Sequence, residues 1–84
     1  MTPENKIYIA IGPYCWGKGF SRKQAIDAMR KEWSQTYAGK FSVKKYKVYI
    51  CFDPWAVIDD MGGICYTPIV GYDGPMCKEA PIAL

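Results

Sequence analysis

The sequence predicts a small α+β domain in which one amphipathic helix covers one face of a mostly antiparallel sheet of three or four strands. Three observations predict this fold. Two stretches alternate apolar and polar side chains, a stretch between them repeats apolar residues at helical spacing, and two later apolar runs flank a glycine-containing loop. The expected order is β-α-β-β-β. All 84 residues are expected to form one domain, because hydrophobic cores divide only in chains several times longer.

The first strand is expected at residues 6–12. Ile7, Ile9 and Ile11 occupy one face of this segment. Tyr8 and Ala10 occupy the other face, which gives the period-two pattern of a strand. A glycine and a proline follow and end it, since proline cannot donate a hydrogen bond to a neighbouring strand.

A helix is expected to begin after Ser21. Ser21 and Gln24 match a capping box, in which each side chain bonds a backbone amide near the helix start. Apolar side chains at helical spacing then form a narrow stripe that faces the sheet, and charged residues fill the remaining surface. The stripe consists of Ala25, Ile26, Met29 and Trp33. The helix is expected to end near residues 34–35.

Residues 44–52 give the strongest strand pattern in the chain. One face holds Tyr46, Val48, Ile50 and Phe52, and the other holds Lys45, Lys47, Tyr49 and Cys51. Because a single helix covers a single face, we expect the remaining face of the sheet to be either exposed to solvent or a binding surface. That face is expected to carry Tyr8, Tyr49, Lys45 and Lys47.

The last third of the chain predicts a hairpin followed by an irregular tail. An Asp-Pro turn at residues 53–54 precedes two short apolar runs, 55–58 and 64–67, which are joined by a loop containing Gly62 and Gly63. Glycine and proline recur after this point. Residues from about 70 to 84 are therefore expected to be irregular.

Charge is distributed unevenly along the chain. Residues 18–47 contain nine of the eleven basic residues and only two acidic ones, a net charge of +7. Residues 48–84 carry a net charge of −4, and the whole chain carries +3. Segregated charge speaks to association with partners and not to the fold.

The segment 12–19 matches the pattern G-x-x-x-x-G-K between a strand and a helix. A nucleotide-binding loop of this kind needs a serine or threonine hydroxyl after the lysine to bind Mg²⁺, and Gly19 stands there instead. We therefore interpret the segment as a glycine-rich connector. A weaker hypothesis is a site for one phosphate or carboxylate at the helix N-terminus, where backbone amides are free. Its residues would be Gly17, Lys18, Gly19 and Ser21.

No pattern in the chain indicates catalysis, a metal or a cofactor. The sequence has no histidine, and its nearest pair of cysteines is Cys65 and Cys77, whereas zinc ligands usually lie two to four residues apart. A cysteine nucleophile also needs a neighbouring base, usually histidine. We therefore expect a protein that is not an enzyme, with free thiols at Cys15, Cys51, Cys65 and Cys77.

The chain shows neither an apolar run of about 20 residues, which a membrane span requires, nor the apolar segment of a signal peptide. The expectation is a cytoplasmic protein with no membrane contact.

The basic middle of the chain is the main functional signal. Its lysines could contact phosphates while Tyr49 stacks on a base, or the same surface could meet an acidic protein. A solvated helix face, and lysines that discourage strand aggregation, would explain the pattern without any partner. Trp16 and Trp55, in expected loops, are candidate anchors of a protein interface. The full predicted partner-binding set is Arg22, Lys23, Arg30, Lys31, Lys44, Lys45, Lys47, Tyr49, Trp16 and Trp55.

The layout of strand, Cys-Trp-Gly-Lys-Gly segment, capped helix, tyrosine-rich strand and Asp-Asp-Met-Gly-Gly hairpin resembles that of small proteins encoded by bacteriophages and prophages. Some of those proteins are anti-defence inhibitors of the anti-CRISPR type. The resemblance implies a non-enzymatic inhibitor that binds and obstructs a host protein or ribonucleoprotein complex inside a bacterial cell. The alternative is a small nucleic-acid-binding module that uses the same basic surface.

Overall fold

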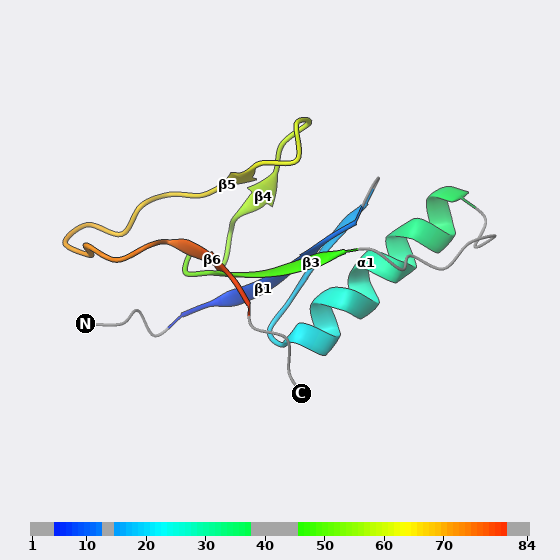
Figure 1. Cartoon of the computed structure of the whole chain (residues 1–84), viewed down its shortest axis with the longest axis horizontal. Coiled ribbons are helices and arrows are strands. Elements are labelled where there is room, and N and C mark those ends of the chain that lie inside the picture. The colour runs from blue at the N-terminus through cyan, green and yellow to red at the C-terminus, as the bar shows by residue number, and fades with distance from the viewer. Residues whose placement is uncertain (1–4, 13–14, 38–45, 81–84) are drawn as a thin grey trace.

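The computed structural model describes residues 5–12, 15–37 and 46–80. In this part of the chain one helix and six strands form an α+β domain, which confirms the predicted fold class (Figure 1). Four strands make an antiparallel sheet in the order β2-β1-β3-β6, and β4 and β5 make a separate hairpin. The elements are β1 (Ile7–Ile11), β2 (Trp16–Gly19), α1 (Arg22–Tyr37), β3 (Lys47–Cys51), β4 (Val57–Ile58), β5 (Ile64–Cys65) and β6 (Cys77–Glu79).

The segment expected to be a glycine-rich connector is strand β2. It pairs with β1 from Tyr8 opposite Gly19 to Ile11 opposite Trp16. Gly17 and Gly19 are needed here because α1 lies directly against β2. A Cβ atom at position 17 would lie 2.7 Å from a backbone carbon of the helix and 2.8 Å from a backbone oxygen. The glycines therefore permit close helix–strand packing, whereas the sequence predicted only a glycine-rich connector.

The second difference is β6, which lies in the tail that was expected to be irregular. The Phe52 amide donates to the Met76 carbonyl (2.9 Å) just before β6, and the Ala80 amide donates to the Val48 carbonyl (2.8 Å) just after it. The Tyr72 ring packs edge-on against Phe52, with the ring centres 5.9 Å apart, and so returns the chain to the sheet. Three residues are too few for an alternating pattern to be recognised in sequence.

The helix begins where the capping pattern predicts. The Gln24 amide donates to Ser21 Oγ (3.1 Å), and Gln24 Oε1 accepts from the Phe20 amide (2.9 Å). α1 continues to Tyr37, slightly beyond the predicted end. Ala25 and Met29 of the predicted stripe are fully buried against the sheet.

Strand register corrects the assignment of residues to faces. Tyr8 pairs with Ile50, and Ile9 pairs with Tyr49, so Tyr8 lies under the helix and not beside Tyr49. Val48 and Ile50 face α1, as their alternation predicted. Alternation defines the two faces of each strand, but only register decides which faces of neighbouring strands coincide.

The face of the sheet opposite α1 is also covered in part. Ile7, Ile9 and Cys51 are buried there with Ala56, and the hairpin formed by β4 and β5 packs against this cluster through its isoleucines. Figure 1 shows the hairpin projecting from the sheet on a different side from the helix. The hairpin itself was predicted at these positions, but its role as a cover for the second face was not.

Candidate functional site

The predicted basic surface is divided between the two faces of the sheet. Lys23, Arg30 and Lys31 of α1 are exposed, and Arg22 is half-buried. The Arg30 guanidinium lies 5.9 Å from the centre of the Tyr46 ring, a distance typical of a cation–π contact. These helix cations therefore lie on the side of the molecule that carries α1.

Lys47, the basic residue of β3, lies on the face of the sheet opposite α1. Lys47 pairs with Ile11, and Tyr49 pairs with Ile9, so both side chains lie on the face opposite α1. The sheet consequently separates Lys47 from the helix cations. A single patch that runs from the helix onto this strand does not form at Lys47.

Strand β2 adds two residues to the face that carries Lys47. Trp16 and Lys18 pair with the same isoleucines of β1 that pair with β3. Lys44 and Lys45 of the predicted set lie outside the described residues. The sheet-face cluster, as we name it here, consists of Trp16, Lys18, Lys47 and Tyr49.

The residues of the predicted anion site do not converge. Gly17 and Gly19 face α1, whereas Lys18 lies between them and belongs to the opposite face of β2. Ser21 Oγ already accepts a hydrogen bond from the Gln24 amide, one of the helix-start amides available to an anion. Lys18 therefore lies on the face of β2 opposite the one that packs against α1.

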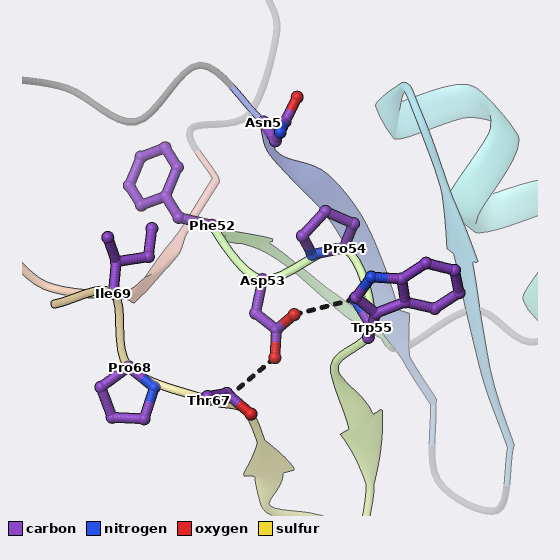
Figure 2. Close-up of a pocket in the computed structure, with 8 residues that line it drawn as sticks. All are labelled: Asn5, Phe52, Asp53, Pro54, Trp55, Thr67, Pro68 and Ile69. Atoms are coloured by element: carbon purple, nitrogen blue, oxygen red, sulfur yellow. Dashed lines mark hydrogen bonds between the residues drawn. The ribbon is translucent and has the colours of Figure 1, made fainter.

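A largely apolar open groove of about 680 Å³ lies where β3 leaves the sheet (Figure 2). It is built from segments that are distant in sequence: one residue before β1, the turn after β3, and the segment after β5. We call it the Trp55 groove. Its lining residues are Asn5, Phe52, Asp53, Pro54, Trp55, Thr67, Pro68 and Ile69.

Asp53 holds the groove together. Its Oδ1 accepts from the Trp55 amide (3.0 Å) and its Oδ2 accepts from the Thr67 amide (2.8 Å), as Figure 2 shows. The side chain is only 9% exposed, and the Asp53 carbonyl also accepts from the Ala56 amide (3.1 Å). One carboxylate thus fixes the turn after β3 and joins it to a segment fourteen residues away.

Trp55 is 85% exposed although its backbone is fixed by Asp53. The surrounding segment, 53–73, exposes further apolar side chains on β4 and in the loops. The same segment contains four aspartates and no lysine or arginine. These exposed apolar residues are Trp55, Val57, Met61, Tyr66, Ile69 and Val70. Among the described residues, the aromatic side chain with the largest exposed fraction therefore lies in the acidic part of the chain.

Among the residues that the structure describes, Asp59 and Cys77 have shifted pKa values. Hydrogen bonds from the Gly63 and Met61 amides lower the pKa of the exposed Asp59 carboxyl. Desolvation, together with a hydrogen bond to Cys51, raises the pKa of Cys77 to about 12. The Cys77 and Cys51 sulfur atoms are 2.9 Å apart.

Within the described ranges, no three residues among His, Cys, Asp and Glu gather closely enough to hold a metal ion. Nor, over the same ranges, does any helix combine the length and the apolar composition that crossing a bilayer requires.

Sequence reasoning selected Trp55 but missed the groove beside it. Asp53 was interpreted only as part of an Asp-Pro turn. An aspartate whose side chain caps the amide two residues on is a known turn device, so its bond to Trp55 had a sequence signal. Its bond to Thr67 had none, because nothing in a sequence reports contacts between distant loops.

Comparisons with protein-family models, with curated proteins and with solved structures gave no match to this chain.

Proposed function

We propose that this chain is a non-enzymatic binding protein that docks on a protein partner through the Trp55 groove. The observation that carries the proposal is an 85% exposed tryptophan, held at the edge of an apolar groove by a buried aspartate. A residue whose backbone is already fixed loses less conformational entropy on binding, and tryptophan is enriched among residues that dominate interface energies.

The charge of the surrounding segment defines the partner's chemistry. Four aspartates and no basic residue lie between positions 53 and 73. The groove is lined mainly by aromatic, proline and isoleucine side chains, and the carboxylate of Asp53 is already bonded to two amides. A complementary partner therefore presents an apolar side chain flanked by lysine or arginine.

The biological setting we propose is obstruction of a larger host complex. The small α+β layout without a catalytic pattern is similar to that of phage-encoded inhibitors. Such inhibitors act by occupying a surface that the host complex needs, and an apolar groove with an aromatic anchor suits that role. The helix cations, on another side of the molecule, would then be available to a second area of the same partner.

The test compares capture from bacterial lysate by the wild-type chain and by two matched variants, with bound proteins quantified by mass spectrometry. Trp55→Ala removes the anchor, while Met61→Ala removes a 93% exposed side chain at the hairpin tip, away from the groove lining. We expect one partner to be lost at least tenfold with Trp55→Ala and retained with Met61→Ala. Circular dichroism of each variant checks that the fold is intact.

A third variant, Lys23→Glu, reports on the helix cations. Loss of the partner with Lys23→Glu and full retention with Trp55→Ala would place docking on α1 and refute the proposed groove. Partners retained equally by every variant would refute it as well.

A second candidate function, nucleic-acid binding, is favoured by the sheet-face cluster. Strand register places two aromatic rings and two lysines on one face of an antiparallel sheet. Single-stranded nucleic acids bind such faces by stacking bases on aromatic rings while cations contact phosphates. We expect affinity for a mixed oligonucleotide to fall with salt, and to fall further with Lys47→Glu than with Lys23→Glu. Binding that ignores salt, or responds equally to both variants, would exclude this function for the cluster.

A further inference from the structure

Two cysteines face each other across the central and edge strands of the sheet. Cys51 of β3 pairs directly with Cys77 of β6, and their sulfur atoms are 2.9 Å apart. All four cysteines of the chain are in the thiol state. Cys51 is completely buried, whereas Cys77 is partly exposed at the edge of the sheet.

The hydrogen-bond pattern shows that this pair occupies a position suited to a disulfide. The Phe52 amide bonds the Met76 carbonyl, and the Ala80 amide bonds the Val48 carbonyl. Hydrogen-bonded and non-hydrogen-bonded residue pairs alternate along an antiparallel ladder. Because the pair 52/76 is hydrogen-bonded, the next pair, Cys51 and Cys77, is non-hydrogen-bonded. In such pairs the Cα atoms are about 4.5 Å apart and the side chains lie closest. That separation falls within the range of about 4.4–6.8 Å found for disulfides.

We propose that Cys51 and Cys77 form an oxidation-sensitive dithiol that a small-molecule disulfide, of the glutathione disulfide class, converts into a cross-strand disulfide. The partly exposed Cys77 first loses its proton, a step that its pKa of about 12 makes infrequent at neutral pH, and its sulfur then attacks one sulfur of the oxidant and releases one thiolate. The Cys51 sulfur then attacks Cys77 and releases the second. The two cysteines lose two electrons and two protons, and the oxidant leaves as two thiols.

The other two cysteines lack this arrangement. Cys65 is exposed on β5 and donates to Asp59 Oδ2 at 3.7 Å. Cys15 is buried next to β2 and packs in the core on the helix side of the sheet. Cys77 instead packs at the sheet edge with its partner thiol already in contact. Oxidation is therefore directed to one pair, and Cys65 serves as an internal exposed control.

The disulfide closes the loop of residues 52–76, which contains the β4–β5 hairpin and all the lining residues of the Trp55 groove except Asn5. β6 is an edge strand, and within the described residues the strand that it pairs with is β3. A covalent bond to β3 fastens this edge and restricts the unfolded chain. Closure of a loop of this length is expected to raise Tm by roughly 10 °C. This inference does not depend on the proposed function of the groove.

The experiment equilibrates the full chain in reduced and oxidised glutathione over a range of ratios, then blocks remaining thiols with N-ethylmaleimide. Intact mass and peptide mapping identify the products. We expect loss of two hydrogens, one cross-linked peptide that joins Cys51 to Cys77, and a Tm rise that dithiothreitol reverses. Cys65→Ser should keep all three results and Cys77→Ser should lose them.

Peptide mapping of the wild-type chain decides the matter even if Cys77→Ser folds poorly. A map that shows glutathione on Cys65 with both Cys51 and Cys77 alkylated would overturn the proposal. Cross-links between chains, or pairs that include Cys15, would overturn it too.

Discussion

Gly17 occupies a position in β2 at which α1 leaves no space for a side chain. A Cβ atom there would touch the Met29 amide and lie 2.8 Å from the Ala25 carbonyl oxygen. Both are backbone atoms, so relief requires movement of the helix. We expect Gly17→Ala to lower the free energy of unfolding by about 3 kcal/mol, measured by urea denaturation. Lys18→Ala, on the opposite face of the same strand, is the matched control and should change it little.

The structure around the Trp55 groove likewise depends on a single residue, Asp53. Asp53→Ala leaves two part-buried amide donors without their acceptor, and we expect a loss of about 2–3 kcal/mol in the free energy of unfolding. Asp53→Asn keeps one acceptor oxygen and should lose less. The exposed Asp60 provides the control, and an equal effect of Asp60→Ala would contradict a specific role for Asp53.

At the residue scale, the sequence predicted contacts correctly where the two contacting residues are close in the chain. The cap at Ser21 and the stripe through Ala25 and Met29 follow from spacings of three or four residues. It failed where the partner is distant. The requirement for glycine at position 17 comes from the helix backbone, and a glycine in a sequence is equally compatible with a flexible loop.

At the scale of elements, the β4–β5 turn depends on a side-chain anion. Asp59 Oδ1 accepts from the Met61 and Gly63 amides at 2.9 and 2.8 Å, and Gly62 adopts the left-handed conformation within the turn (φ 82°). These bonds lower the pKa of Asp59 below its ordinary 3.8. The resulting stabilisation is complete above that ordinary value and is lost as pH falls through the lower pKa of the folded state.

We therefore expect the Met61 and Gly63 amide resonances to shift together when the protein is acidified below about pH 4, measured by NMR. Asp59→Asn keeps a neutral acceptor, so its shifts should not depend on pH over this range. A wild-type titration centred above pH 4 would mean that the folded state does not favour the anion.

The hairpin and the helix could be predicted because each has a local sequence pattern. Glycines between two apolar runs indicate the hairpin, and a capping box indicates the start of the helix. β2 and β6 could not be predicted. β2 contains two glycines that weaken any strand signal, and β6 has three residues, two of which are charged. Both are edge strands, where pairing with a central strand supplies most of the structure.

At the scale of the whole molecule, the basic residues that the structure describes between α1 and β3 do not share one surface. A run of cations along a chain passes from α1 into β3, but the sheet turns the side chain of Lys47 away from the helix. The Trp55 groove, by contrast, is a site that no sequence pattern indicated. Its lining residues come from three segments that are distant in sequence, although Trp55 itself was predicted to be an interface anchor.

The ionisation of Cys77 makes the stability of the fold depend on pH. Desolvation and the contact with Cys51 raise its pKa to about 12 from an ordinary 9.0, and the negative charge of Asp53 acts in the same direction. The folded state therefore holds this proton more tightly than the unfolded chain does. Folding stability from this thiol is intact below about pH 9 and decreases as pH rises toward 12.

Thermal unfolding of the reduced protein at several pH values between 8 and 11 tests this sign, with Cys77→Ala as the comparison. All the other ionisable groups are common to both proteins, so the difference between the two Tm curves isolates Cys77. We expect the Tm of the wild type to fall more steeply above pH 9 than that of the variant. Parallel curves would mean that the thiolate is tolerated at the edge of the sheet. In that case β6 would not be held by a neutral dithiol, and oxidation of the pair at a given pH would be faster than a pKa of about 12 for Cys77 allows, because the thiolate is the attacking species.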